Sequence, residues 1–243
     1  MPVTSNSWAE PGAEPRLRIV SWNCHGSIGR DGRCDRERTL AVIAALDPDI
    51  LALQEVDGRS HLGRRERAFE FFAARLGGHL VEARTVRREG RDYGHLLWSR
   101  HPILQSRVHI LPGGGFEPRA AVEALCETAL GPVRMMATHL GLGPRNRRLQ
   151  ADFLASTIAR SDAPAIVLGD FNEWRRGGAV DAALAERLPA RVSVRSWPAR
   201  WPLAYFDRLY ASPSLQPVRR DVPAWMAHAS DHLPLAVDIS AAR

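Results

Sequence analysis

The chain has 243 residues, of which 45% are apolar, and this is enough for one large α/β domain with a buried core. Its formal net charge is +6, and all 33 basic residues are arginines. A basic surface favours polyanionic partners, but charge alone does not separate nucleic acid from anionic lipid headgroups. The three cysteines, Cys24, Cys34 and Cys126, have no C-x-x-C spacing, which argues against a disulfide framework and a zinc site.

Residues 1–15 are polar, contain Pro and Gly, and follow no periodic pattern. We therefore expect a flexible lead-in, followed by a single domain at 16–240. The lead-in lacks the basic start and apolar core of a signal peptide, and no apolar run reaches the roughly 20 residues of a membrane span. We expect a soluble, cytoplasmic protein without a transmembrane segment, and the sequence indicates no obligate protein partner.

Helical periodicity occurs in four segments, where apolar residues recur every three or four positions. The segments are Glu37–Leu46, Glu66–Leu76, Asn146–Arg160 and Val180–Leu188. In the first three, the apolar stripes expected to face the core are Leu40, Ile43 and Ala44; Phe69, Phe72, Ala73 and Leu76; and Leu149, Phe153, Leu154 and Ile158. Asp47-Pro48 is expected to end the first helix, and Gly77-Gly78 the second.

Apolar runs typical of β-strands lie between these helices. In chain order they are Arg18–Asn23, Ile50–Glu55, His95–Trp98, Ile103–Ile110, Ala120–Thr128, Val133–His139, Ala165–Leu168, Ala204–Asp207 and Leu233–Ile239. The runs 95–98, 103–110 and 120–128 follow one another through turns, which indicates antiparallel pairing. We predict an α/β protein with a four-layer α/β/β/α sandwich, in which two mixed β-sheets pack face to face between helices.

Polar side chains follow the buried run at 165–168, which ends in Gly169-Asp170-Phe171-Asn172. In extended backbone, residues i and i+2 share a face, so Asp170 and Asn172 point the same way. Other predicted strands also end in, or follow, residues capable of chemistry: Asn23, Glu55, His139, Asp207, and Asp231 with His232. An open α/β sheet gathers such ends at one edge, where ligands commonly bind.

The oxygen-bearing members of this set suit Mg²⁺ or Mn²⁺ rather than zinc. They are Asn23, Glu55, Asp170, Asn172 and Asp231. Magnesium is usually held by one or two carboxylates together with water and substrate phosphate. The two histidines fit a phosphoryl-transfer site, because one can take a proton from attacking water while the other stabilises charge on the phosphate.

Asp207 has two interpretations. It can fix the tautomer of His232, as a carboxylate normally does for a catalytic imidazole, or it can form a turn or a surface ion pair with Arg208. Asp231 is less suited to bonding His232, since successive strand side chains diverge. The remaining histidines are expected to be ordinary surface or hydrogen-bonded residues: His25, His61, His79, His101, His109 and His228.

Six short motifs occur in order over residues 16–240: Asn23 in VSWNCHG, Glu55 in LALQEVD, His139 in ATHLG, GDFN at 169–172, Asp207 in FDRLY, and SDH at 230–232. The set resembles the endonuclease/exonuclease/phosphatase superfamily, which includes DNase I-like nucleases, abasic-site endonucleases, inositol-phosphate phosphatases and neutral sphingomyelinases. HLGL at 139–142, DFNEW at 170–174 and RSWPARWPL at 195–203 are similar to a bacterial branch described as metal-dependent hydrolases.

The resemblance implies a divalent-metal site. Glu55 would bind the ion with Asn23 nearby, and Asp231 would help to hold it. Asp170 and Asn172 would serve both the metal and the reaction, since Asp170 would activate or orient the attacking water and Asn172 would contact phosphate. The implied cofactor is Mg²⁺ or Mn²⁺, and the implied partner is a phosphoester substrate such as nucleic acid or a phospholipid headgroup.

The resemblance also implies catalytic roles outside the metal set. His232 would be the base-like histidine paired with Asp207, and His139 would bond the scissile phosphate. Arg119, in EPRAAVEAL, matches an active-site arginine of part of the family; alternatively it is a solvated loop residue. The chain departs from the family pattern at 93–95, where Tyr-Gly-His stands in place of the Gly-Asn of many relatives.

Three functions follow from these observations. The leading one is a divalent-metal-dependent phosphodiesterase or nuclease that uses water as nucleophile. The alternatives are a sphingomyelinase-like hydrolase of phospholipid headgroups or a small-phosphoester phosphatase, and a catalytically silent phosphate-binding module. Trp174, Trp197 and Trp201 lie near the motifs and can stack on bases, enter a lipid interface or simply pack.

Overall fold

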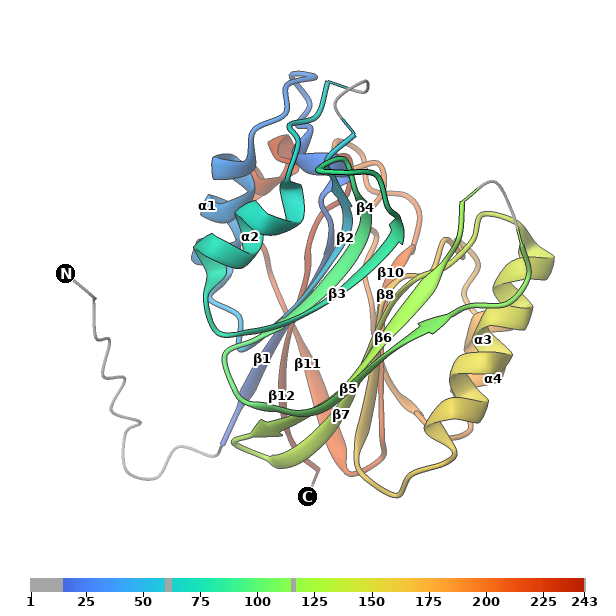
Figure 1. The fold of residues 1–243 in the computed structure, drawn as a ribbon. Helices are drawn as coiled ribbons and strands as arrows, with labels where there is room; N and C mark the ends of the chain where they lie inside the picture. Colours follow the sequence, from blue (N-terminus) through green and yellow to red (C-terminus); the bar gives the residue numbers. More distant parts are fainter. Residues whose placement is uncertain (1–14, 60–62, 115–116, 243) are drawn as a thin grey trace.

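The computed structural model describes residues 15–59, 63–114 and 117–242. Within these ranges the chain forms two six-stranded mixed sheets that pack face to face, with helices on both outer faces (Figure 1). The predicted four-layer sandwich is therefore confirmed. Most of the predicted lead-in, residues 1–14, and His61 lie outside the described residues.

The first sheet has one parallel strand pair at its centre, β1 with β2, and its other pairs are antiparallel. Across the sheet, the strands are β11 (Leu215–Arg220), β12 (Leu235–Ala241), β1 (Leu17–Asn23), β2 (Ile50–Asp57), β4 (Tyr93–Ser99) and β3 (His79–Val86). Because β1 and β2 are buried along nearly their whole length, apolar residues predominate in both strands.

The second sheet repeats this plan, with β7 and β8 as its central parallel pair. Across the sheet, the strands are β5 (Ile103–Ile110), β6 (Ala120–Thr128), β7 (Gly131–His139), β8 (Ala165–Asp170), β10 (Asp207–Ala211) and β9 (Ala190–Ser193). In both sheets an antiparallel strand, β12 or β10, lies directly beside the parallel pair. At one edge of each sheet, the C-terminal ends of the two parallel strands therefore lie beside the N-terminal end of the neighbouring antiparallel strand.

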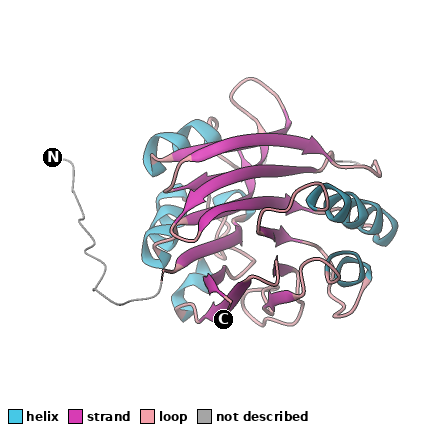
Figure 2. Cartoon of the chain, turned by 90° about the horizontal axis from the view of Figure 1, so that it is seen from below, coloured by secondary structure: helices cyan, strands magenta, loops and turns pink. Residues whose placement is uncertain are grey.

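Helices flank the two sheets on opposite sides, as the view from below also shows (Figure 2). On the outside of the first sheet lie α1 (Arg36–Leu46) and α2 (Ala68–Leu76), and on the outside of the second lie α3 (Pro144–Ile158) and α4 (Ala179–Leu184). Two 3₁₀ helices, η1 (His25–Ser27) and η3 (Ala224–His228), lie in loops. None of the helices in the described ranges has the length and apolar character that crossing a bilayer requires.

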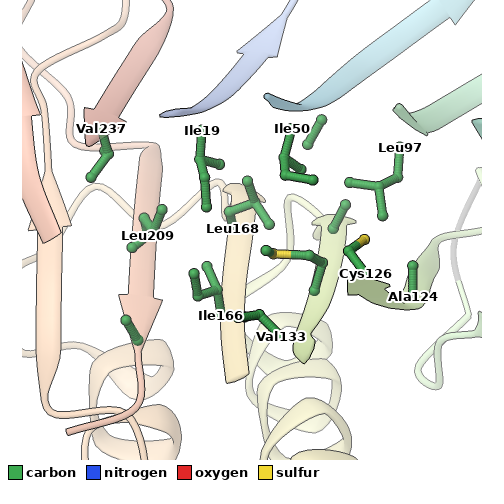
Figure 3. Packing of buried hydrophobic residues seen from close by; sticks show 14 of the residues in the cluster. Ile19, Ile50, Leu97, Ala124, Cys126, Val133, Ile166, Leu168, Leu209 and Val237 are labelled. Atoms are coloured by element: carbon green, nitrogen blue, oxygen red, sulfur yellow. The ribbon is translucent and has the colours of Figure 1, made fainter. Parts of the chain in front are cut away.

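The largest hydrophobic cluster fills the space between the two sheets (Figure 3). Ile19 and Ile50 project into it from the first sheet, and Leu168 and Leu209 from the second. Two further clusters each lie between one sheet and its helices, the first against α1 and α2 and the second against α3 and α4. Full burial of a leucine or isoleucine stabilises the fold by roughly 1.5–3 kcal/mol, so this layer holds the two sheets in a fixed relation.

The predicted faces of α1, α2 and α3 each differ from the observed ones at one residue. Leu149, predicted to be buried in α3, is 44% exposed, and Arg147 and Gln150 are buried instead. Both buried side chains bond backbone groups: Gln150 Oε1 accepts from Gly141 N (2.8 Å), and Arg147 Nη1 donates to Leu142 O. The prediction was therefore wrong at Leu149 only, because hydrogen bonds to the β7–α3 loop select polar residues on that part of the face, while Leu154 and Ile158 are buried as predicted.

Small residues on the other two helices were also misplaced. Ala44 of α1 and Ala73 of α2 are exposed, although both were predicted to face the core. In α1, Val42 and Leu46 lie in the buried face with Ile43. Alanine offers little apolar surface, so its position is set by where its larger neighbours pack.

The strand prediction needs three corrections. β4 and β5 do not pair, because β4 joins the first sheet and β5 the second. The strand near Asp207 begins at this residue rather than ending there. Three strands were not predicted at all, namely β3, β9 and β11, whose largely polar or half-exposed residues give no continuous apolar run.

Candidate active site

The candidate active site lies at the edge where the central parallel strands of both sheets end. Asn23 is the last residue of β1, and Glu55 lies near the end of β2. From the second sheet, His139 ends β7 and Asp170 ends β8, and the two residues pair in the ladder. The sheet packing thus turns four separate strand ends into one polar cluster.

Asp207 and His232 reach the same edge from the opposite direction. Asp207 begins β10 and lies opposite Asp170 in the antiparallel ladder. His232 precedes β12, which is antiparallel to β1. Because antiparallel strands start where their neighbours end, residues that begin these strands join those that end the parallel pairs.

The amide of Asn23 joins the two sheets. Its Nδ2 donates to Glu55 Oε1 (2.9 Å) and to Asp170 Oδ2 (3.0 Å), so carboxylates from different sheets lie on one amide group. Glu55 has a left-handed φ of 54° beside a β-bulge in the pairing of β2 with β4, and Asn172 has a φ of 51°. Non-glycine residues in this region are strained, and such strain concentrates at functional sites.

Arg119 and His139 form a direct contact. Arg119 Nη1 donates to His139 Nδ1 (2.9 Å), so Nδ1 is the acceptor and the ring proton lies on Nε2. Burial, followed by the charge of Arg119, holds the pKa of His139 well below its usual range. His139 is therefore neutral at pH 7, with Nε2 lying 3.6 Å from Asp170 Oδ2.

His232 has the opposite electrostatic environment. Its Nδ1 donates to Asp207 Oδ2 (2.9 Å), and its Nε2 lies 3.8 Å from Asp170 Oδ2. Burial alone lowers the pKa of His232, but the charges of Asp207 and Asp170 outweigh it and raise this pKa to about 10. Burial also raises the pKa of Asp170, against the opposing charge of His232. Asp170 thus lies between one neutral and one cationic imidazole.

The structure decides between the alternatives for Asp207 and Arg119. Asp207 is fully buried, and its neighbour Arg208 pairs with Asp181 instead (3.1 Å), so the surface ion pair is wrong. The side chain of Arg119 is 12% exposed and bonds His139, so it is not a solvated loop residue.

The donor set fits a hard divalent cation. Glu55 and Asp170 present carboxylate oxygens around one amide, and Asn172 is tied to the same cluster because its backbone N–H donates to Asp170 Oδ1 (2.9 Å). In the described part of the chain, no three or more His, Cys, Asp or Glu side chains are grouped as a metal-binding cluster. One or two carboxylates are the usual protein ligands of magnesium, whose shell is completed by water and phosphate.

Asp231 lies at the rim of this cluster, and its side chain is 42% exposed. Its carboxylate accepts from Trp197 Nε1 (3.3 Å) and lies 3.5 Å from His25 Nδ1. The preceding residue, Ser230, donates to the backbone oxygen of Asn23 (2.8 Å), which places the segment beside β1. His25, predicted to be an ordinary histidine, therefore lies beside the site. Its position two residues after Asn23 was the sequence signal for this placement.

A polar layer beneath the site was not predicted. Arg119 Nη2 pairs with Glu117 (3.1 Å), which also accepts from the Tyr93 hydroxyl (3.2 Å). His95, two residues further along β4, is 3% exposed, and its Nε2 has no hydrogen-bond partner within the described residues. Two polar residues at i and i+2 in a buried strand were the available signal, because they share one face.

The fold and the site together define a class of protein. The family model for the endonuclease/exonuclease/phosphatase family matches residues 20–232, and the chain belongs to this family. Members of the family hydrolyse phosphoesters and generally use divalent metal ions.

Particular relatives are known within this class. The chain is 27% identical over 221 residues to the uncharacterized protein YbhP of Escherichia coli K12, covering 81% of this chain and 85% of that protein. A family member from Beutenbergia cavernae has a similar structure, with a TM-score of 0.73, 23% identity, and coverage of 93% of this chain and 72% of that one. The human Nocturnin catalytic domain with bound sulfate has a TM-score of 0.71, 21% identity, and coverage of 95% and 96%. The two structural similarities show the fold.

Proposed function

We propose that this protein is a divalent-metal-dependent phosphodiesterase or nuclease, with Mg²⁺ or Mn²⁺ as its ion and water as nucleophile. The observation that carries this proposal is the convergence of Glu55 and Asp170 on the amide of Asn23, with both imidazole Nε2 atoms within 4 Å of Asp170. Burying polar groups of this kind costs free energy unless they form hydrogen bonds or ion pairs with a ligand or with one another. Perturbed pKa values also concentrate at functional sites.

The oxygen-bearing side chains of this cluster would hold the ion: Asn23, Glu55, Asp170, Asn172 and Asp231. When bound, the ion supplies positive charge that polarises a phosphate oxygen and lowers the pKa of bound water. Asp231 lies on the solvent-exposed side of this set. It would therefore bind the ion from the side that faces solvent.

The two histidines and Asp170 have different roles in this proposal. Asp170, whose pKa burial raises, accepts the proton of the attacking water. His139, which stays neutral, would donate a hydrogen bond from its Nε2–H to a phosphate oxygen and would transfer no proton. His232 holds a proton at neutral pH because of Asp207, so it supplies positive charge and a proton donor rather than the base-like role implied by the family resemblance.

A panel of substrates tests the proposal. Purified protein with Mn²⁺ is incubated with bis-(p-nitrophenyl) phosphate, with DNA and with phospholipids, and product is measured for the wild type, His232→Ala and the control His79→Ala. His79 is exposed and outside the site. We expect hydrolysis of one class that His232→Ala abolishes and His79→Ala leaves intact. Intact substrates in all wild-type reactions would refute the proposal.

A phospholipid headgroup is the second candidate substrate, because large apolar side chains are exposed close to the site. Trp174 and Leu142 lie two and three residues after Asn172 and His139, and are 59% and 73% exposed. Trp201, in a loop bound to Asp231 through Ala199 N (2.7 Å), is 68% exposed. Such residues enter a lipid interface readily.

Vesicles that contain phosphatidylglycerol test this second candidate by cosedimentation and by release of the headgroup. Trp201→Ala reduces both if the substrate lies in a bilayer. If the protein hydrolyses soluble substrates but neither binds nor cleaves the vesicles, the substrate is nucleic acid or a small phosphoester.

A further inference from the structure

A second cavity lies away from the candidate active site, on the outer face of the second sheet. It has a volume of about 360 Å³ and is lined by residues of β5, β6 and β7 and by the C-terminal end of α3. The lining is basic: Arg107, Arg134, Arg160 and His109 contribute to it. Glu123 is the one acidic residue that the described part of the chain places in this lining.

Glu123 already has partners within the cavity. Its carboxylate accepts from His109 Nε2 (2.7 Å) and forms an ion pair with Arg134 Nη1. One carboxylate therefore balances Arg134, whereas Arg107 and Arg160 have no ion-pair partner among the described residues. The cavity consequently holds an excess of two guanidinium charges.

Three of the lining side chains are largely withdrawn from solvent, whereas Arg107 and Arg160 are exposed. The side chains of His109, Glu123 and Arg134 are 12%, 14% and 20% exposed. The Nε of Arg134 is buried and has no hydrogen-bond partner within the described ranges. A buried donor without a partner costs free energy, so an acceptor from outside the chain would stabilise this arrangement.

One feature opposes anion binding here. Arg160 follows the last turn of α3, and the C-terminal end of a helix carries partial negative charge. This charge weakens the field of Arg160. Arg107 and Arg134 lie on strands, whose net dipoles are small, so their charges are not reduced in this way.

We propose that this cavity is a second, non-catalytic anion site that binds a small phosphorylated compound. A dianionic phosphate group matches the two unpaired guanidiniums, and arginine forms paired hydrogen bonds with phosphate oxygens. The volume lies within the range of small-molecule sites. Arg134 precedes His139 by five residues on β7, which separates the cavity from the candidate active site by roughly 16 Å along the strand. The cavity is therefore spatially separate from the residues of the proposed hydrolysis.

Isothermal titration calorimetry with pyrophosphate tests the proposal on metal-free protein in the presence of a chelator at low salt. We expect a dissociation constant below about 1 mM for the wild type. Arg107→Gln and Arg160→Gln each remove one charge-assisted contact and weaken binding by about tenfold. Arg187→Gln changes the net charge equally at an exposed position outside the cavity, and it leaves binding unchanged. Circular dichroism checks that all variants are folded.

Asn172→Ala separates this cavity from the candidate active site, and it leaves pyrophosphate binding unchanged if the proposal is correct. Loss of binding in Asn172→Ala would place the anion in the active site and overturn the proposal. If Arg187→Gln weakens pyrophosphate binding as much as the cavity variants do, the binding is general attraction to a basic surface, and the proposal is overturned as well. Wild-type affinity in both cavity variants, or no binding up to about 10 mM, would have the same consequence.

Discussion

Replacing His95 by asparagine is expected to make the stability of this protein less sensitive to acid. Burial, with the nearby charge of Arg119, lowers the pKa of His95 from 6.5 to about 4. As the pH falls below 6.5, the unfolded chain binds a proton at His95 that the folded chain does not bind until near pH 4. Folding therefore loses stability through this window, by about 3 kcal/mol between pH 7 and pH 4.

Urea denaturation, followed by circular dichroism at several pH values between 7 and 4, measures this loss. His139 shifts in the same direction, and the charge of His95 contributes to that shift, so the difference between wild type and His95→Asn reports His95 together with its effect on His139. We expect His95→Asn to lose about 3 kcal/mol less than the wild type, whatever its stability at pH 7. The control His79→Asn, at an exposed position, keeps the wild-type loss. If His95→Asn loses as much stability between pH 7 and pH 4 as the wild type does, the claim that His95 is buried in its neutral form is refuted.

Two further substitutions test the electrostatics of the fold. Asp207→Asn removes the charge that holds the His232 imidazolium, so we expect the pKa of His232 in metal-free protein to fall by about 1–3 units in an NMR titration, and kcat to fall by about 10²- to 10⁴-fold. An unchanged pKa would show that Asp207 does not set the charge of this ring. Asp181→Asn leaves the buried Arg208 without its charged partner and should cost about 3 kcal/mol of unfolding free energy in urea, whereas a cost below about 1 kcal/mol would contradict this reasoning.

The strand ends of the candidate site could be predicted because a polar residue after a buried apolar run has few explanations. Asn23, Glu55 and Asp170 were each predicted as site residues on this ground. The order of the motifs along the chain indicated the family. The sequence could not indicate that Asp207 begins its strand. The local sequence pattern is the same whether a strand ends or begins at Asp207. Only the antiparallel pairing of β10 with β8 distinguishes the two possibilities.

Contacts between distant segments explain the rest of what sequence reasoning missed. His139 and His232 both lie near strand ends, yet burial and the charge of Arg119 keep His139 neutral, whereas Asp207 makes His232 cationic. Likewise, β4 and β5 are adjacent in the chain but belong to different sheets, a choice made by packing in the layer between the sheets rather than by local propensity.

The central claim is that Glu55 and Asp170, from different sheets, hold one divalent-ion site, and Mn²⁺ binding measured by calorimetry tests it most directly. Glu55→Gln and Asp170→Asn are compared with the control Glu127→Gln, which changes an exposed carboxylate outside the site. We expect each site variant to weaken Mn²⁺ binding at least about tenfold, while the control binds Mn²⁺ as the wild type does. Wild-type Mn²⁺ affinity in both site variants would contradict it.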